Sequence, residues 1–181
     1  ETSVDEVSSR LDDGYEMDVT KFRPNIVVSG AEMPWEEDFW GELAVGESGA
    51  RIVLTSNCVR CVSINVSYET GTHGKTENEQ VYKKLTKDRR VDKGAKYNPV
   101  FGRYGFLKGD GDVPIRVGDP VEVTRTLSER TTFGTKFNDK RSSRADLCRL
   151  AGVGILVAIG IKGGGLVAKH CRIRLFDNKT R

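Results

Sequence analysis

A chain of 181 residues is long enough for one domain with a sizeable core and too short for two full ones. Hydrophobic residues make up 37% of it and charged residues 30%, and the formal net charge of +3 is too small to indicate nucleic-acid binding by itself. Four cysteines are too few for a disulfide-rich secreted scaffold, and no signal-peptide pattern opens the sequence, so we expect an intracellular protein. The first residue is Glu1 rather than Met, which indicates a fragment or a processed form.

The N-terminal third of the sequence predicts one helix and three strands. Apolar residues at helical spacing predict a short capped helix over residues 4–11. A β-branched run predicts a strand over 26–28, and the acidic stretch 30–38 with its proline is typical of a loop. Two further strands, over 40–45 and 51–54, are joined by GESG, which predicts a hairpin.

Short strands continue along the middle of the sequence. Alternating apolar and polar residues predict a strand over 59–68 with one buried face. A short basic helix is expected over 80–90, and a turn followed by a strand over 98–107. Residues 115–123 predict two short strands bent at Gly-Asp-Pro. Many short strands with few helices predict an α+β, mainly β protein with a closed or strongly curved sheet.

The C-terminal third has a different composition. Residues 134–144 are polar and basic, as in a mobile linker. Residues 150–161 are almost wholly apolar and glycine, and three glycines follow soon after. Three interpretations stay open for this stretch: a buried strand or helix packed on the domain, a membrane span that would need more apolar residues, and a poorly ordered tail.

The sequence CVRC at 58–61 is the first candidate site. A zinc site would need a second close pair, whereas Cys148 and Cys171 are far apart in sequence. A thioredoxin-type dithiol would open a helix, whereas a strand is expected here. Inert core cysteines are the ordinary alternative, although burial of Arg60 would then require partners. We favour a thiolate at Cys58 or Cys61 that binds a soft, redox-active metal or attacks a substrate, with its pKa lowered by the neighbouring guanidinium.

The sequence FRPN at 22–25 is the second candidate. Arg23 and Asn25, held by the proline between them, have the donors to bind an anionic head group, and the alternative is a surface arginine before a strand. GKT at 74–76 resembles the end of a phosphate-binding loop, but Glu69 stands where that loop has its first glycine, so we interpret it as a hairpin turn. KDRR at 87–90 is a solvated helix end or a contact for an acidic partner.

Five motifs occur together in an order that resembles the MOSC domains. These are the C-terminal domains of molybdenum cofactor sulfurases and of the mitochondrial amidoxime-reducing component, and the resemblance is strongest to the amidoxime-reducing branch. It covers residues 3–126. The motifs are FRPNIVV at 22–28, EEDFW at 36–40, CVRC at 58–61, FGRY at 101–104 and VGDPV at 117–121.

The resemblance implies a MOSC-type β-barrel with a few short peripheral helices. It divides the chain into a MOSC domain over 1–130, which begins inside the C-terminal half of the family, and an unmatched C-terminal extension over 131–181. The family's N-terminal domain, which carries further basic contacts to the cofactor and the usual membrane anchor, is expected to be absent. Membrane association through that part is therefore expected only for a longer protein.

The resemblance also implies a pyranopterin molybdenum cofactor and the residues that hold it. Cys61 carries over as the protein ligand to molybdenum and, with Arg60, as a catalytic residue. Arg23 and Asn25 carry over as the residues that hold the pterin phosphate. The full set of expected cofactor contacts is Arg23, Asn25, Val59, Arg60 and Tyr104. Pyridoxal phosphate binding is a further family-level implication.

The implied activity is two-electron reduction of N-hydroxylated substrates such as amidoximes. Cytochrome b5 and NADH-cytochrome b5 reductase would supply the electrons, and the implied location is the mitochondrial outer membrane or the cytoplasm. The alternative is a non-catalytic module that binds the cofactor or carries sulfur. A third hypothesis, nucleic-acid binding, rests only on pI and Lys-Arg clusters, and we expect no nucleic-acid partner.

Overall fold

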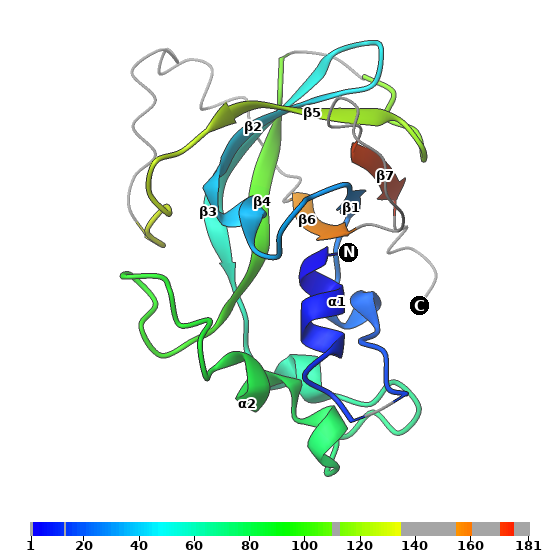
Figure 1. The fold of residues 1–181 in the computed structure, drawn as a ribbon, viewed down its shortest axis with the longest axis vertical. Helices are drawn as coiled ribbons and strands as arrows, with labels where there is room; N and C mark the ends of the chain where they lie inside the picture. Colours follow the sequence, from blue (N-terminus) through cyan, green and yellow to red (C-terminus); the bar gives the residue numbers. More distant parts are fainter. Residues whose placement is uncertain (1, 13, 110–112, 135–154, 161–170, 176–181) are drawn as a thin grey trace.

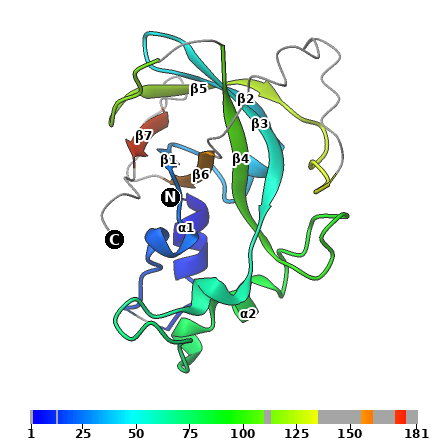
Figure 2. The same ribbon diagram turned by 180° about the vertical axis from the view of Figure 1, so that it is seen from behind.

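The computed structural model describes five segments of the chain, the last two by their backbone alone: residues 2–12, 14–109, 113–134, 155–160 and 171–175. Strands make up most of the regular secondary structure described, and the helices are short (Figures 1 and 2). The expected α+β, mainly β class is therefore confirmed.

Seven strands and two α-helices are described, together with single turns of 3-10 helix. The strands are β1 Ile26–Ser29, β2 Trp40–Val45, β3 Ala50–Val59, β4 Val100–Lys108, β5 Pro120–Thr126, β6 Ile155–Gly160 and β7 Cys171–Leu175. The α-helices are α1 Thr2–Ser8 and α2 Val81–Leu85. The 3-10 turns are η1 Val19–Phe22, η2 Glu36–Phe39, η3 Val62–Asn65 and η4 Glu77–Glu79.

The strands pair in the order β1-β6-β4-β3-β2-β5-β7, and β7 also pairs with β1. The order of pairing thus returns to its first strand, although β5 and β7 pair through only two positions, Pro120 with Arg172 and Val121 with Cys171. Among the described pairs only β1 and β6 run parallel. The sheet is mostly antiparallel, and α1, α2 and η3 lie at one end of it (Figure 1).

The hairpin between β2 and β3 forms as the sequence predicts. Val45 pairs with Ala50, and the turn between them contains Gly46 and Gly49 with φ of 65° and 63°. Glycine reaches this left-handed region without the steric cost that a Cβ imposes. The inner face of the hairpin supplies much of the core.

The buried residues form two clusters, and β1 contributes to both. Ile26 and Val28 belong to one cluster and Val27 to the other, as alternation along a strand requires. The first cluster lies within the curved sheet and contains Ile26, Val28, Ala31, Trp40, Leu43, Val45, Ala50, Ile52, Leu54 and Val121. The second lies where the helices meet the sheet and contains Val4, Val7, Met17, Phe22, Val27, Cys58, Ile64, Val81, Leu85 and Phe101.

The prediction of a strand over 59–68 is wrong. β3 continues to Val59, and the chain then forms the 3-10 turn η3. Of the alternating apolar residues, Ile64 is buried, whereas Val62 is 50% exposed. Only Val66 makes a strand-like contact, a bridge to His73. The alternation fails as a signal because a 3-10 turn can bury one residue of such a short run without pairing its backbone.

Two other expectations are wrong in part. The helix expected over 80–90 ends at Leu85, because the chain turns so that Arg89 is buried and its carbonyl oxygen accepts from the amide of Val100 at 2.9 Å. The first of the two strands expected in 115–123 is a turn, in which the amide of Asp119 donates a hydrogen bond to the carbonyl oxygen of Arg116. Only the second, β5, pairs in the sheet.

The apolar stretch 150–161 contains β6, which pairs with β1 and β4. Of the interpretations open for this stretch, the strand is therefore confirmed over Ile155–Gly160. The rest of that stretch lies outside the described residues, as does the linker expected over 134–144 apart from its first residue. No helix in the described part of the chain is both long and apolar enough to cross a membrane.

Candidate functional site

The two cysteines of CVRC occupy different environments at the end of β3. Cys58 lies in the strand and is 3% exposed, while Cys61 follows the strand and is exposed. Both are free thiols. β3 pairs with β4, and the register of this pairing shifts twice, between Leu54 and Ser56 and between Asn57 and Val59. Irregularities of this kind bend a strand and redirect its side chains, and here they immediately precede the exposed thiol.

Ser63 is the immediate partner of Cys61. The Cys61 Sγ and Ser63 Oγ atoms lie 2.8 Å apart, at the start of η3. The hydroxyl hydrogen bond of Ser63, followed by its backbone amide, lowers the pKa of the Cys61 thiol. The charge of Arg60 contributes least to this lowering. The pKa of Cys61 is therefore lowered, as expected for a cysteine of this pair. The main cause is Ser63 rather than the expected guanidinium of Arg60.

The side chain of Arg60 is buried, with 8% exposure. Its Nη1 donates to the carbonyl oxygen of Phe22 at 2.7 Å, and its Nε and Nη2 donate to that of Phe101 at 3.0 and 2.7 Å. The guanidinium also lies 5.3 Å from the ring centre of Phe22 and 5.8 Å from that of Phe101. Burial lowers the pKa of Arg60. The partners required by a buried arginine are thus carbonyl oxygens and aromatic rings.

The bond from Arg60 to Phe22 joins CVRC to FRPN. Phe22 ends η1, and Arg23 follows in the left-handed region with φ 51° and an exposed side chain. The amide of Arg23 donates to the carbonyl oxygen of Thr20 at 2.8 Å, and the hydroxyl of Tyr68 donates to the same oxygen at 2.9 Å. A non-glycine residue in this region is uncommon and is held there by its surroundings. The structure therefore brings the exposed Arg23 and the exposed Cys61 onto adjoining segments.

The other expected contact residues lie on the same segments. Asn25 is half-buried just before β1 and has a bonding partner. Val59 is half-buried at the end of β3 and pairs with Val100. Tyr104 is half-buried on β4, opposite Ser56. A hydrogen bond with the buried Cys58, together with burial, raises the pKa of Tyr104 to about 12. Tyr104 thus contacts the first cysteine of the pair.

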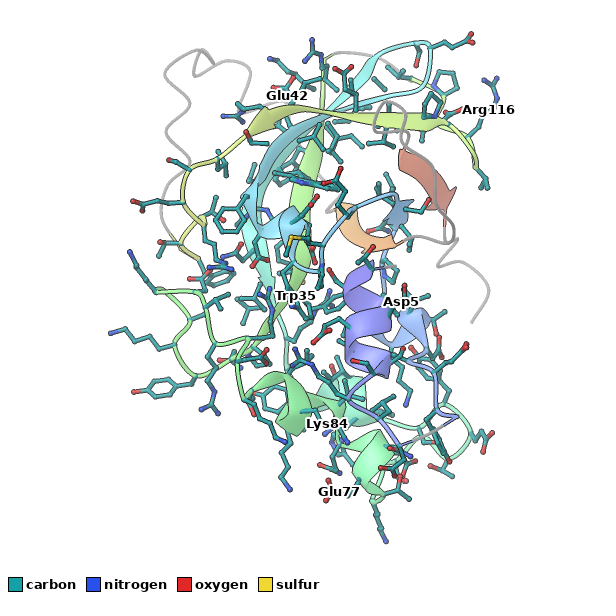
Figure 3. All side chains as sticks on the ribbon, in the orientation of Figure 1. Asp5, Trp35, Glu42, Glu77, Lys84 and Arg116 are labelled. Atoms are coloured by element: carbon teal, nitrogen blue, oxygen red, sulfur yellow. The ribbon has the colours of Figure 1, made fainter. Side chains whose placement is uncertain are left out.

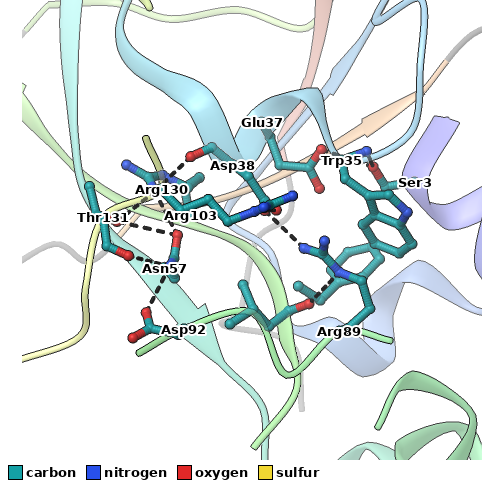
Figure 4. Close-up of polar contacts among 12 residues, drawn as sticks. Ser3, Trp35, Glu37, Asp38, Asn57, Arg89, Asp92, Arg103, Arg130 and Thr131 are labelled. Atoms are coloured by element: carbon teal, nitrogen blue, oxygen red, sulfur yellow. Dashed lines mark hydrogen bonds and ion pairs between the residues drawn. The ribbon is translucent and has the colours of Figure 1, made fainter. Parts of the chain in front are cut away.

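A buried polar cluster lies between η2, β3 and β4, and the sequence analysis did not anticipate it (Figure 4). The Asp38 carboxylate is fully buried and accepts from Arg89 at 2.9 Å and from Arg130 at 2.7 Å. Arg103 is also fully buried, and its Nη1 donates to Asn57 at 2.6 Å and to the Asp38 carbonyl oxygen at 3.2 Å. Charges taken from water require such partners.

The cluster continues toward the loop after α2. The Nδ2 of Asn57 donates to Asp92 at 2.7 Å, and Asp92 also accepts from the amides of Gly94 and Phe133. Nothing in the residues of EEDFW and FGRY indicates that Asp38 and Arg103 are buried together. Arg103 is a charged residue inside an otherwise apolar run, which is a signal of burial, whereas Asp38 stands in an acidic stretch that carries no such signal.

Trp35 and Glu37 lie next to the polar cluster (Figures 3 and 4). The ring of Trp35 meets Phe101 edge-on at 5.7 Å, and the guanidinium of Arg89 lies 4.0 Å from its centre. Glu37 is fully buried and accepts from the Ser3 hydroxyl at 2.9 Å. Burial, and secondarily the charge of Asp38, raises the pKa of Glu37 to about 7.

Among the described residues no group of three or more His, Cys, Asp or Glu side chains is placed to hold a metal ion. Cys148 and His170 lie outside the described residues, and Cys171 is described by its backbone alone. GKT at 74–76 leads into η4 and caps it, and the Glu79 carboxylate accepts from the amides of residues 75 and 76. The prediction of a hairpin turn there is wrong, because the nearby bridge between Val66 and His73 encloses residues 67–72 instead.

The curved sheet and the paired FRPN and CVRC segments define a MOSC domain. A sequence model of the MOSC domain matches residues 1–122, and the chain belongs to this family. It is similar to mitochondrial amidoxime-reducing component 1 of Homo sapiens, with 35% identity over 122 residues, and to mitochondrial amidoxime reducing component 2 of Rattus norvegicus, with 38% identity over 122 residues. Each alignment covers 67% of this chain and 34% of the relative. The chain thus spans about a third of the length of the curated relatives it matches.

Proposed function

We propose that this chain is the cofactor-binding part of a molybdenum oxidoreductase that reduces N-hydroxylated substrates such as amidoximes. The observation that carries the proposal is the exposed Cys61 thiol, with its lowered pKa, on a segment that Arg60 bonds to the segment of Arg23. Membership in the MOSC family and similarity to amidoxime-reducing components support it.

The residues fit the cofactor in two respects. An exposed thiol that ionises readily is a suitable soft ligand for a redox-active metal. An exposed guanidinium on a constrained turn can pair with a phosphate through two parallel hydrogen bonds. We propose Cys61 as the metal ligand, with Arg23 and Asn25 as the phosphate contacts and Val59, Arg60 and Tyr104 near the pterin.

In this proposal the protein's own side chains bind and orient. Ser63 holds Cys61 through the 2.8 Å contact and favours its thiolate form. Arg60 fixes the distance between the Cys61 and Arg23 segments through the Phe22 and Phe101 carbonyl oxygens. The bound cofactor would supply the two electrons. An amidoxime that accepts two electrons and two protons gives an amidine and water.

The remaining features of the proposal follow the family. The order of strand pairing, which returns from β7 to β1, supports a MOSC-type barrel. The division into a domain over 1–130 and an extension over 131–181, the mitochondrial location and pyridoxal phosphate binding stay predictions. Cytochrome b5 and NADH-cytochrome b5 reductase are the proposed electron donors, and similarity to relatives named mitochondrial amidoxime-reducing components supports them. Because the chain spans about a third of those relatives, the activity is proposed for the whole protein that contains it.

The test is metal analysis of the protein purified in a form that includes any preceding N-terminal domain. The parent protein should contain molybdenum, Cys61→Ala should contain none, and Cys58→Ala should retain most of it because Cys58 is buried beneath the site. Absence of molybdenum from the parent would refute the proposal. A protein that binds the cofactor but does not reduce an amidoxime when a chemical reductant supplies the electrons would instead support the alternative, a non-catalytic cofactor-binding or sulfur-carrier module.

A further inference from the structure

The chain between α2 and β4 exposes a basic surface. We use this name for Lys87, Arg90, Lys93 and Lys96, all of which are exposed. None of the four makes an ion pair within the part of the chain that the structure describes. The positive charge of this surface is therefore available to a partner.

The two acidic residues of the same stretch are already engaged. Asp88 accepts from both terminal nitrogens of Arg10, at 2.6 and 2.8 Å. Asp92 is 2% exposed and accepts from Asn57 and two backbone amides. Asp88 keeps 51% of its side chain exposed, but Arg10 already balances its charge, while Asp92 is buried. The stretch therefore presents to solvent four cations that have no ion pair in the described part of the chain, against one carboxylate that is already paired.

The loop that contains Lys93 and Lys96 is held at both ends. At its start, the Asp92 carboxylate accepts a hydrogen bond from the amide of Gly94, and the Asp92 carbonyl oxygen accepts one from the amide of Ala95. The Nδ2 of Asn98 fixes its end by donating to the Tyr82 hydroxyl at 3.2 Å and to the Arg60 carbonyl oxygen at 3.3 Å. A loop ordered before binding loses less conformational entropy when a partner docks.

Tyr97 lies near the end of this loop, directly after Lys96, and is 82% exposed, the largest exposed fraction among the large hydrophobic side chains described. Tyrosine offers a rigid apolar ring and a polar hydroxyl, and it is enriched at interface hot spots. An exposed tyrosine on the same segment as several exposed cations is suited to bind an acidic protein surface that also has an apolar part.

The basic surface adjoins Cys61. Asn98 bonds the carbonyl oxygen of Arg60, and the amide of Arg60 bonds the carbonyl oxygen of Pro99 at 2.8 Å. Cys61 is the next residue along the chain. On its other side η3 is tied to α2, since Asn65 accepts from the amide of Tyr82 at 2.9 Å. In Figure 1, α2 and the loop after it lie at the same end of the molecule as η3.

We propose that the basic surface, together with the exposed Tyr97, docks the acidic face of an electron-donating protein beside Cys61. This inference rests on the proposed function, because it names where the donor of that site binds. Electrostatic steering would bring an acidic donor to this surface quickly, and the short path from the loop to Cys61 would place its redox group near the metal ligand. Nucleic acid is the less favoured occupant, since four cations on one turn-rich segment form no extended stripe.

The test compares two double variants of the cofactor-loaded protein with equal changes in charge. Lys93→Glu/Lys96→Glu alters the basic surface. Lys108→Glu/Arg116→Glu alters two exposed cations at the other end of the molecule, where Arg116 is labelled in Figure 3. The probe is the soluble haem domain of cytochrome b5. Its Kd is measured by titration calorimetry, its KM in amidoxime turnover, and turnover is repeated with reduced methyl viologen.

The basic-surface variant should raise both the Kd and the KM for the haem protein by about tenfold and leave viologen-driven turnover unchanged. The difference should vanish at about 1 M salt, where the screening length falls to about 3 Å. The control variant should behave like the parent. The inference would be overturned if Kd and KM for the haem protein rose equally in both variants or did not rise in the basic-surface variant. It would also be overturned if the basic-surface variant lost affinity for single-stranded RNA and not for the haem protein. A parent that turns over with neither reductant refutes the proposed function, while the Kd comparison still decides the docking surface.

Discussion

The guanidinium of Arg60 and the carbonyl oxygen of Phe22 lie 2.7 Å apart in the protein interior. This one bond joins two motifs that are more than thirty positions apart along the chain, and it comes from the second of the two residues between the cysteines. Arg60 thereby acts on the site through backbone geometry. Its neighbour Arg23 is the cation that is open to solvent.

Replacement of Arg60 by methionine should destabilise the fold. The substitution keeps most of the side-chain volume but removes three hydrogen bonds to buried carbonyl oxygens, so we expect a loss of about 2–4 kcal/mol in the free energy of unfolding. Urea denaturation measures the loss, with Arg116→Met as an exposed control. Amide exchange at Arg23 should also accelerate, because its turn loses the bond to Phe22. An unchanged exchange rate in a folded variant would contradict this role for Arg60.

Replacement of Asp38 by alanine should be among the most destabilising changes near the cluster. It leaves Arg89, which is 3% exposed at its side chain, without a carboxylate partner. Breaking a buried ion pair from one side costs about 3–5 kcal/mol, because the remaining charge stays in a poorly solvating interior. The measurement is chemical denaturation, and Glu47→Ala, on the exposed hairpin turn, serves as the control. Equal stability of the two variants would show that the cluster does not contribute as the structure indicates.

Glu37 should make the protein less stable as pH rises. Its pKa is about 7 in the folded state against an ordinary value of 4.5, so between these values the folded state holds a proton that the unfolded state has lost. Stability therefore declines as pH increases from about 4.5 to 7, by up to about 3 kcal/mol. Glu37→Gln should flatten this decline and exceed the parent in stability above pH 7. Denaturation across the pH range tests this, with the exposed Glu32→Gln as the control, whose profile should match that of the parent.

Cys61 should be the first described cysteine to react with iodoacetamide in the cofactor-free protein. It is exposed and its pKa is lowered, whereas Cys58 is 3% exposed. Ser63→Ala removes the main cause of the lowering and should slow alkylation at neutral pH roughly two- to fivefold. Peptide mass spectrometry over time gives both rates. Faster labelling of Cys58, or no effect of Ser63→Ala, would be inconsistent with the contact seen here.

The candidate site was partly predictable because its residues stand in short, ordered motifs. The thiols, the arginine proposed to bind an anion and the strand before Cys58 all follow from local sequence. The separate roles of the two cysteines depend on which of them β3 buries. The cause of the lowered pKa of Cys61 depends on a turn, η3, that was expected to be a strand.

The sequence by itself determined the mainly β class, the hairpin of β2 and β3 and the family, since strand periodicity, turn glycines and motif order are local properties. Only the tertiary structure decided that Arg60 turns inward to two carbonyl oxygens, that Asp38 and Arg103 are buried together, and that β6 joins β1 and β4. Each of these depends on contacts between residues far apart in the chain. Burial and charge pairing are set by such contacts, and no local pattern encodes which distant partner will satisfy a charged side chain.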